Sequence, residues 1–285
     1  MNDAYKKVIE ANIAVHSKLA SFYEKTEPHF REENIAVVDA RVKAAVEKTG
    51  AKKLLDLGCG TGFMINIAKK HVPHVVGVDV TRAMLDRVDT TGSATIELHE
   101  HDTGTFPVEA GSFDVVTAYS FLHHLYDIEP TLGTAAKALK KGGVFYVDLD
   151  PNGYFWETIV RLDKEGNHDR YDPVVRREID AVAHKDEQIA AEYGIPHEVF
   201  NDAEYGKVHA GGFKEDILRE QLAKAGFSSV TFQYYWYIGQ AFLVNEEGVP
   251  REKRLENAAV ADRVLQKLLP LSRHLYKYVG FTAVK

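Results

Sequence analysis

Acidic side chains close two apolar segments on either side of a glycine-rich turn. The apolar run 54–57 contains Asp56, and a second apolar run ends at Asp79. Between them, residues 58–62 read Gly-Cys-Gly-Thr-Gly. Glycines let the backbone turn sharply and let a ligand lie against the main chain. In doubly wound folds, an acid about 20 residues beyond such a turn binds the hydroxyls of a ribose. The spacing therefore predicts a nucleotide-like ligand.

The same turn argues against a phosphate-bearing coenzyme. A dinucleotide-binding turn reads G-x-G-x-x-G and places a helix N-terminus against a pyrophosphate, whereas Gly62 here comes one residue early. The carboxylate of Asp56 would repel a pyrophosphate, but it can accept hydrogen bonds from an ammonium group. The expected ligand therefore has a ribose, a cationic amino-acid tail and no phosphate. An NAD-dependent oxidoreductase is the alternative that these two features disfavour.

Short apolar segments alternate with helical segments on both sides of this turn. The alternation predicts parallel strands joined by right-handed crossovers, with the helices between them. The expected strands lie near residues 53–57, 74–79, 94–99, 113–118 and 143–149. In an open sheet of this kind, ligands bind beyond the carboxyl ends of the strands, which is where both acids fall.

Five segments in this order resemble the class I S-adenosylmethionine-dependent methyltransferases. The segment 54–62, Leu-Leu-Asp-Leu-Gly-Cys-Gly-Thr-Gly, is similar to the first motif of that family. The others are Asp79, residues 101–114, residues 115–125 and residues 139–147. The resemblance covers roughly residues 50–150. It implies S-adenosyl-L-methionine as the cofactor and a Rossmann-like doubly wound α/β sheet, mostly parallel with an antiparallel last strand.

The resemblance also implies which residues bind the amino-acid tail and the ribose of the cofactor. Asp56 and the backbone of Gly58 and Gly60 would hold the amino-acid tail. Asp79 matches the acid that binds the ribose in that family. The cofactor itself would supply an activated methyl group, so the protein has to align an acceptor and exclude water.

Further cofactor contacts are expected in three other segments. Asp102, with Thr103 beside it, matches the adenine-contacting position, although an ordinary turn acid is the alternative there. Ala118 and Tyr119 end the fourth expected strand and should lie close to the methionyl part. Tyr23 belongs to an N-terminal segment that folds over the cofactor in similar proteins, and its ring would attract a sulfonium by cation–π interaction.

Two histidines are the candidates for acid–base chemistry. His123 and His124 follow the fourth expected strand, at the rim toward which the methyl group would point. A neutral imidazole can take a proton near pH 7, so one of them is the candidate general base. Structural packing of both rings is the alternative. The remaining histidines are not spaced for a metal site, and no metal is expected.

The rest of the chain divides around this core. Residues 151–212 break the strand–helix alternation, and an insertion there would cap the substrate site, or serve only as a structural addition. The strand candidate 230–244 and the helix candidate 255–275 lie in the last region. The expected parts are N-terminal helices packing on the sheet (1–50), the cofactor-binding core (51–150), the helical cap (151–212), and the end of the core sheet with an extra helix (213–285).

Composition limits the partners and the location. The 285 residues are 45% hydrophobic and 27% charged, and the net charge is −7. Such a chain has no global field that attracts nucleic acid. The first 20 residues mix charges throughout and lack an apolar signal segment, and the weakly polar run 232–244 is too short to span a bilayer. We expect a cytoplasmic protein without membrane insertion; its oligomeric state is not readable from the sequence.

A methyltransferase acting on a small molecule is the leading interpretation. Methylation of RNA or protein is an alternative, but residues 119–124 read Tyr-Ser-Phe-Leu-His-His instead of the Asn/Asp-Pro-Pro-Tyr/Phe of enzymes that methylate exocyclic amino groups. A non-catalytic module that binds S-adenosylmethionine and regulates a partner is a further alternative. The cofactor motifs alone do not distinguish it from an enzyme.

Overall fold

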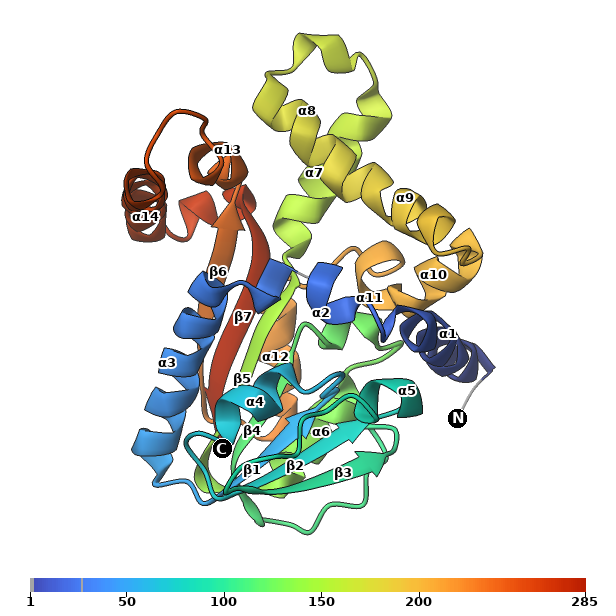
Figure 1. The fold of residues 1–285 in the computed structure, drawn as a ribbon, viewed down its shortest axis with the longest axis vertical. Helices are drawn as coiled ribbons and strands as arrows, with labels where there is room; N and C mark the ends of the chain where they lie inside the picture. Colours follow the sequence, from blue (N-terminus) through green and yellow to red (C-terminus); the bar gives the residue numbers. More distant parts are fainter. Residues whose placement is uncertain (1–2, 27) are drawn as a thin grey trace.

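The protein, described by a computed structural model over residues 3–26 and 28–285, is built on one seven-stranded sheet (Figure 1). The strand order is β3-β2-β1-β4-β5-β7-β6. The strands are β1 (Lys53–Leu57), β2 (His74–Asp79), β3 (Thr95–Glu100), β4 (Phe113–Tyr119), β5 (Leu139–Pro151), β6 (Ser229–Tyr237) and β7 (Tyr276–Val284). Strands β1 to β5 pair in parallel, and β7 runs antiparallel to both β5 and β6. The Rossmann-like sheet with an antiparallel last strand is confirmed.

Apolar side chains alternate between the two faces of the sheet, and helices cover both faces. One face packs against α3 (Glu32–Thr49) and α4 (Phe63–Ala68), and its cluster includes Leu54 and Val75. The other face packs against α6 (Glu129–Ala138) and α12 (Glu215–Ala225). The order of the strands reverses between β1 and β4, so a crevice opens at their carboxyl ends. The short α5 (Arg82–Leu85) follows β2 at this edge.

The N-terminal helix α1 (Asp3–Leu19) packs against the insertion, not on the sheet as expected. Its apolar face joins Ala11 and Val15 to Phe200 and Ala203 of α10 (His197–Ala203). Figure 1 shows α1 beside α10, at the side of the molecule away from α3. The next elements are α2 (Tyr23–Thr26) and the 3-10 helix η1 (Pro28–Phe30), and only α3 continues to the sheet. The expectation is wrong for α1 because its apolar face packs against the apolar face of α10.

Residues 151–212 form a helical projection beyond the carboxyl ends of the strands (Figure 1). Its apolar centre joins Phe155, Ile159 and Ile179. The buried carboxylate of Glu178 forms an ion pair with Lys277 of β7, which ties the projection to the sheet. Besides α10, its elements are α7 (Gly153–Glu165), η3 (His168–Arg170), α8 (Pro173–Ile179), the π-helix η4 (Asp180–His184), α9 (Lys185–Glu192) and α11 (Tyr205–Val208).

The C-terminal region departs from the expected boundaries. The strand expected to reach residue 244 is wrong beyond β6, because Gly239 takes a left-handed φ of 81° and α13 (Gln240–Val244) begins there. The helix expected over 255–275 runs earlier, as α14 (Arg251–Lys267), and the 3-10 helix η5 (Leu271–Leu275) follows it. Pro270 accounts for the break, since proline lacks an N–H and disfavours helix in the residue before it. Within the described residues, no helix has both the length and the apolarity needed to cross a membrane.

Asn152 joins the insertion to the end of the sheet, and its removal should be costly. Its buried Nδ2 donates to the carbonyl oxygens of Arg273 and Tyr276, both at 2.7 Å, and its Oδ1 accepts from the N–H of Tyr154 at the start of α7. Asn152→Ala leaves these groups unpaired, so we expect the free energy of unfolding to fall by about 2 kcal/mol in urea titrations. Exposed Asn245→Ala is the control and should change it by less than about 0.5 kcal/mol. Equal losses in the two variants would contradict this account.

Candidate functional site

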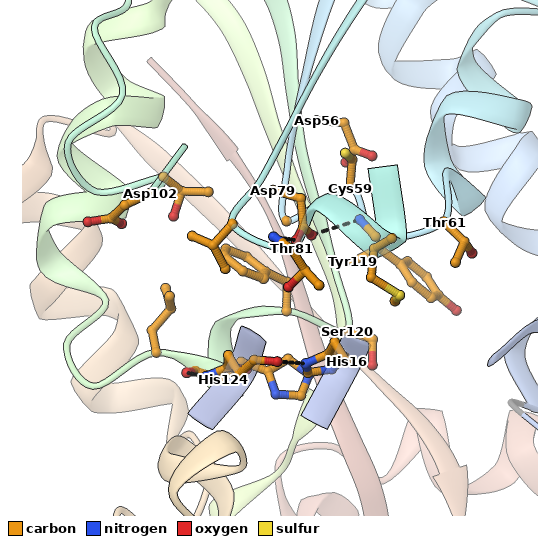
Figure 2. Close-up of a pocket in the computed structure, with 18 of the residues that line it drawn as sticks. His16, Asp56, Cys59, Thr61, Asp79, Thr81, Asp102, Tyr119, Ser120 and His124 are labelled. Atoms are coloured by element: carbon orange, nitrogen blue, oxygen red, sulfur yellow. Dashed lines mark hydrogen bonds between the residues drawn. The ribbon is translucent and has the colours of Figure 1, made fainter. Parts of the chain in front are cut away.

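A pocket lies at the carboxyl ends of β1, β2 and β4, and α1 covers it (Figure 2). It encloses about 930 Å³ of space free of protein atoms, its open mouth included. The described lining residues come from α1, the segment after it, the glycine turn, the end of β2, the turn at 102–103 and residues 119–126. None of them belongs to the insertion, which instead contacts α1.

The glycine turn has the backbone geometry that its sequence predicts. Gly58 and Gly60 have φ values of 72° and 51°, in the left-handed region that favours glycine. The N–H of Gly58 donates to the carbonyl of Val78 at 2.8 Å, which ties the turn to β2. A Cβ on Gly58 would lie 2.0 Å from a ring carbon of Phe121. Any side chain at Gly58 would therefore displace Phe121 from the pocket wall.

Asp56 is a buried carboxylate, and one of its two oxygens has no hydrogen-bond partner among the described residues. Its Oδ1 accepts from Thr117 Oγ1 at 2.7 Å, while Oδ2 has no hydrogen-bond partner in the described part of the chain. Burial raises the pKa of Asp56 to about 7. The hydrogen bond from Thr117 lowers this pKa in part, and the charge of Asp79 raises it slightly further. A cationic donor beside Oδ2 would both satisfy this atom and favour the ionised form.

Asp79 and Asp102 take part in backbone turns and also face the pocket. Asp79 accepts from the N–H of Thr81 at 2.8 Å and from the N–H of Gly60 at 2.9 Å, and burial raises its pKa. Asp102 accepts from the N–H of Gly104 at 2.9 Å and from the Tyr5 hydroxyl at 2.7 Å. Figure 2 shows Asp79 in the centre of the pocket and Asp102 to its left. Asp102 therefore stabilises the turn, as an ordinary turn acid would, and its side chain also lines the pocket.

The charge of the pocket is one-sided. Its described lining includes three carboxylates, those of Asp56, Asp79 and Asp102, and no lysine or arginine. A pyrophosphate would meet negative charge without a compensating cation. A ligand with positive charge would be attracted, because low-dielectric walls strengthen such interactions.

Of the other expected cofactor contacts, some line the pocket and one is buried behind its wall. Tyr119 lines the pocket, and its hydroxyl accepts from Asn34 Nδ2 at 2.8 Å. Tyr23 lines it too, as does Thr103, whose hydroxyl meets that of Thr131 at 2.9 Å. Ala118 is 1% exposed and is not among the described lining residues. Its position in β4 serves to place Tyr119.

The two histidines after β4 have different surroundings. His124 lines the pocket, and its Nδ1 lies 2.8 Å from the carbonyl oxygen of Ala203. Burial lowers the pKa of His124 well below its usual value. His123 is absent from the described lining, and its Nδ1 lies 2.8 Å from Oδ1 of the buried Asp150. Only His124 therefore reaches the pocket, while His123 fixes the turn that carries both.

A grouping behind the pocket was not expected from the sequence. His123, His124 and Glu204 offer possible ligand atoms within 4.8 Å of one another. Lys207 Nζ lies 2.5 Å from Glu204 Oε2, so an ammonium already balances this carboxylate. Burial would raise the pKa of Glu204, but the Lys207 charge and the nearby imidazoles hold it below its usual value. No pattern in the sequence indicates this grouping, because Glu204, between α10 and α11, is far along the chain from the two histidines after β4.

Two further residues in the pocket were missed. His16 of α1 lines it, and its ring lies 4.8 Å from that of His124, measured between centroids. Ser120 takes a left-handed φ of 49°, rare for a residue with a side chain, as the chain leaves β4 into the pocket. An unusual φ leaves no mark in a sequence. His16 was hidden because nothing in the sequence places α1 above the strands.

Comparisons with known proteins agree with this geometry. A family model described as a methyltransferase domain matches residues 55–147. The ubiquinone biosynthesis O-methyltransferase of Escherichia coli O157:H7 (strain EC4115 / EHEC) is 30% identical over 151 residues, 45% of this chain and 60% of that protein. The protein of the same name from Aromatoleum aromaticum is 30% identical over 130 residues, 41% of this chain and 56% of that protein. The chain therefore matches less than two thirds of the length of either relative.

Solved structures show the same fold. A methyltransferase from Archaeoglobus fulgidus superposes with a TM-score of 0.53 at 16% identity, covering 93% of this chain and all of that one. One from Mesorhizobium loti gives 0.51 at 16% identity, covering 86% of this chain and 96% of that one. Residues 55–147 are thus similar to a methyltransferase domain, in agreement with the resemblance to the class I S-adenosylmethionine-dependent methyltransferases. The cofactor of this class is S-adenosylmethionine.

The raised pKa of Asp56 has a measurable consequence for stability without ligand. Its pKa goes from 3.8 to about 7 on burial, so the folded state binds more protons than the unfolded state between these values, and stability falls as pH rises through them. Asp56→Asn removes this charge and keeps an oxygen for Thr117. We expect its free energy of unfolding to exceed that of the wild type by an amount that grows by about 4 kcal/mol from pH 4 to about pH 8 and stays constant above.

Urea titrations at a series of pH values measure this difference. Asp169→Asn is the matched control, because the Asp169 side chain is fully exposed. A difference between Asp56→Asn and the wild type that did not change with pH would show that Asp56 is ionised throughout.

Proposed function

We propose that this protein binds S-adenosylmethionine in the pocket and transfers its methyl group to a small-molecule acceptor. The observation that carries the proposal is the unpartnered Oδ2 of buried Asp56, in a pocket whose described lining has three carboxylates and no lysine or arginine. S-adenosylmethionine has an ammonium and a sulfonium, and no phosphate. Both cationic groups suit this lining, and a pyridine dinucleotide does not.

The residues of the glycine turn and its neighbours would bind the polar ends of the cofactor. Asp56 would accept from the ammonium through Oδ2, which supplies the missing hydrogen bond. The backbone of Gly58 and Gly60 would lie along the amino-acid tail; the space beside Gly60 admits a Cβ, whereas the Phe121 ring fills the space beside Gly58. Asp79 already accepts two backbone N–H bonds, so its carboxylate is held in place to accept from the ribose hydroxyls through its remaining lone pairs.

Aromatic and turn residues would bind the remaining parts. Asp102 and Thr103 would contact the adenine, since both line the pocket beside Asp79. Tyr119 would lie along the methionyl part, with Ala118 holding its backbone in β4. Tyr23 would cover the site and exclude water. The bound cofactor supplies a methyl group that its sulfonium activates toward attack.

The acceptor would be a small molecule, with oxygen as the favoured methylated atom. Two relatives are named O-methyltransferases, which supports oxygen. Enclosure supports a small acceptor, because α1 covers the pocket and the insertion holds α1 through the contact of Val15 with Phe200. Of the two histidines proposed from the sequence, His124 would face the acceptor. His123, bonded to Asp150, would hold His124 in position.

Titration calorimetry should show which ligand the pocket binds. We expect heat of binding with S-adenosylmethionine and with its demethylated product, and none with NAD. Asp56→Asn should weaken binding of both by about 10- to 100-fold, which is the effect of losing one hydrogen bond to a charged group. Asp169→Asn should bind as the wild type does. Binding of NAD alone would refute the cofactor assignment.

Transfer of a labelled methyl group should identify the acceptor class. The wild-type chain would be incubated with methyl-labelled S-adenosylmethionine and, separately, with a small-molecule extract, total RNA and denatured protein. We expect label only in the small-molecule fraction, in a product that depends on intact Asp56. Label in RNA or protein would favour the second interpretation. Cofactor binding with no transfer to any fraction would favour a regulatory module.

A further inference from the structure

Two imidazole rings meet in the pocket, near the Asp79 carboxylate. His16 comes from α1, and His124 comes from the 3-10 helix η2 (Leu122–His124) after β4. Their centroids are 4.8 Å apart and their planes are perpendicular. Figure 2 shows them side by side below Asp79 and Thr81. Residues far apart in the sequence thus place two titratable rings at one point.

Hydrogen bonds to the backbone fix the same tautomer in both rings. His16 Nδ1 lies 2.9 Å from the carbonyl oxygen of Asn12, and His124 Nδ1 lies 2.8 Å from that of Ala203. A carbonyl oxygen only accepts, so each Nδ1 carries the hydrogen and each Nε2 has a lone pair. Neither Nε2 has a hydrogen-bond partner in the part of the chain that the structure describes. Both rings can therefore accept a proton from a molecule in the pocket.

The surroundings of the two rings differ. His124 is buried against His123, and both burial and that neighbour oppose its protonation. His16 is half-buried and lies close enough to Asp79 to interact with its charge. The other ring beside it is that of Tyr23. His16 therefore has both solvent and a carboxylate within reach.

Resting on the function proposed above, we propose that His16 is the proton acceptor of the methyl-transfer reaction and that the acceptor is an uncharged hydroxyl compound. The acceptor O–H bond breaks, and its proton goes to His16 Nε2. The oxygen forms a bond to the methyl carbon, whose bond to sulfur breaks with the electron pair staying on sulfur. His16 then releases the proton to water. His124, buried beside His123, stays neutral.

The lining around the two rings supports an uncharged acceptor. The carboxylates of the pocket are those assigned to the cofactor, and the other described lining residues, Asn12 and Ser120 included, contain no lysine or arginine. An anionic acceptor would meet no cation here. A cationic amine would find Asp56, Asp79 and Asp102 already engaged by the cofactor or the backbone. A hydroxyl that gives up its proton to a neighbouring base needs no counter-ion in the ground state.

The experiment compares His16→Gln with the wild type by three readouts. Calorimetry with the demethylated cofactor tests the pocket, and we expect the affinity of the two proteins to agree within about threefold. Nitrogen NMR of the labelled wild-type imidazoles tests the tautomer, and we expect His16 Nε2 to carry a lone pair. Label transfer to the small-molecule extract tests catalysis, and we expect a loss of about 10²- to 10⁴-fold.

Rescue and control variants separate chemistry from packing. In His16→Ala, added imidazole should restore part of the transfer, which a merely structural role would not allow. His99→Gln, on the edge strand β3 and outside the described lining, should transfer as the wild type does. Transfer by His16→Gln within threefold of the wild type, or a proton on Nε2 of His16, would overturn the assignment. If the unmethylated acceptor of the labelled product proved to be a charged compound, the proposed acceptor class would be wrong. Failure of the wild type itself to transfer would overturn the proposed function and this assignment together.

Discussion

The site depends on keeping a carboxylate buried at the end of β1. Asp56 has one oxygen bonded to Thr117 and the other without a partner, in a sheet interior where ionisation is unfavourable. Such a group destabilises the fold above neutral pH, and a neutral amide would be better tolerated. A cationic ligand removes the penalty, so the free energy lost in folding the empty pocket is recovered on binding. The charge distribution of the pocket follows from this one constraint, because a nearby lysine or arginine would already pair with Asp56.

The same reasoning explains why the turn next to Asp56 contains glycine. Gly58 packs against Phe121 with no room for a side chain, and Gly60 donates its N–H to Asp79. The turn thus connects the two carboxylates rigidly and leaves open space between them. Rigidity matters here, because positioning of an acceptor and exclusion of water are what the protein contributes to methyl transfer.

Local patterns were enough to predict the parallel core. The buried strands and the glycine turn between them also placed the acids Asp56 and Asp79 at one edge of the sheet, and both line the pocket there. The sequence did not place α1, because its position depends on Val15 meeting Phe200 across nearly two hundred residues. His16 could not be assigned for the same reason. Gly239 and Pro270 are visible in the sequence, but the expected strand only bends at Gly239 and the expected helix continues past Pro270; the residue that breaks an element outweighs the pattern around it.

Helix α1 also links the two halves of the site. Its Tyr5 donates to Asp102 at the cofactor side, its Asn12 donates to the carbonyl of His124, and it carries His16. Docking of one helix therefore brings together the residue proposed to contact the adenine, the backbone of the η2 turn and the proposed proton acceptor. The insertion contributes from behind, since Ala203 both packs on α1 and fixes the tautomer of His124. A change in how α1 packs would therefore disturb all three parts of the pocket at once.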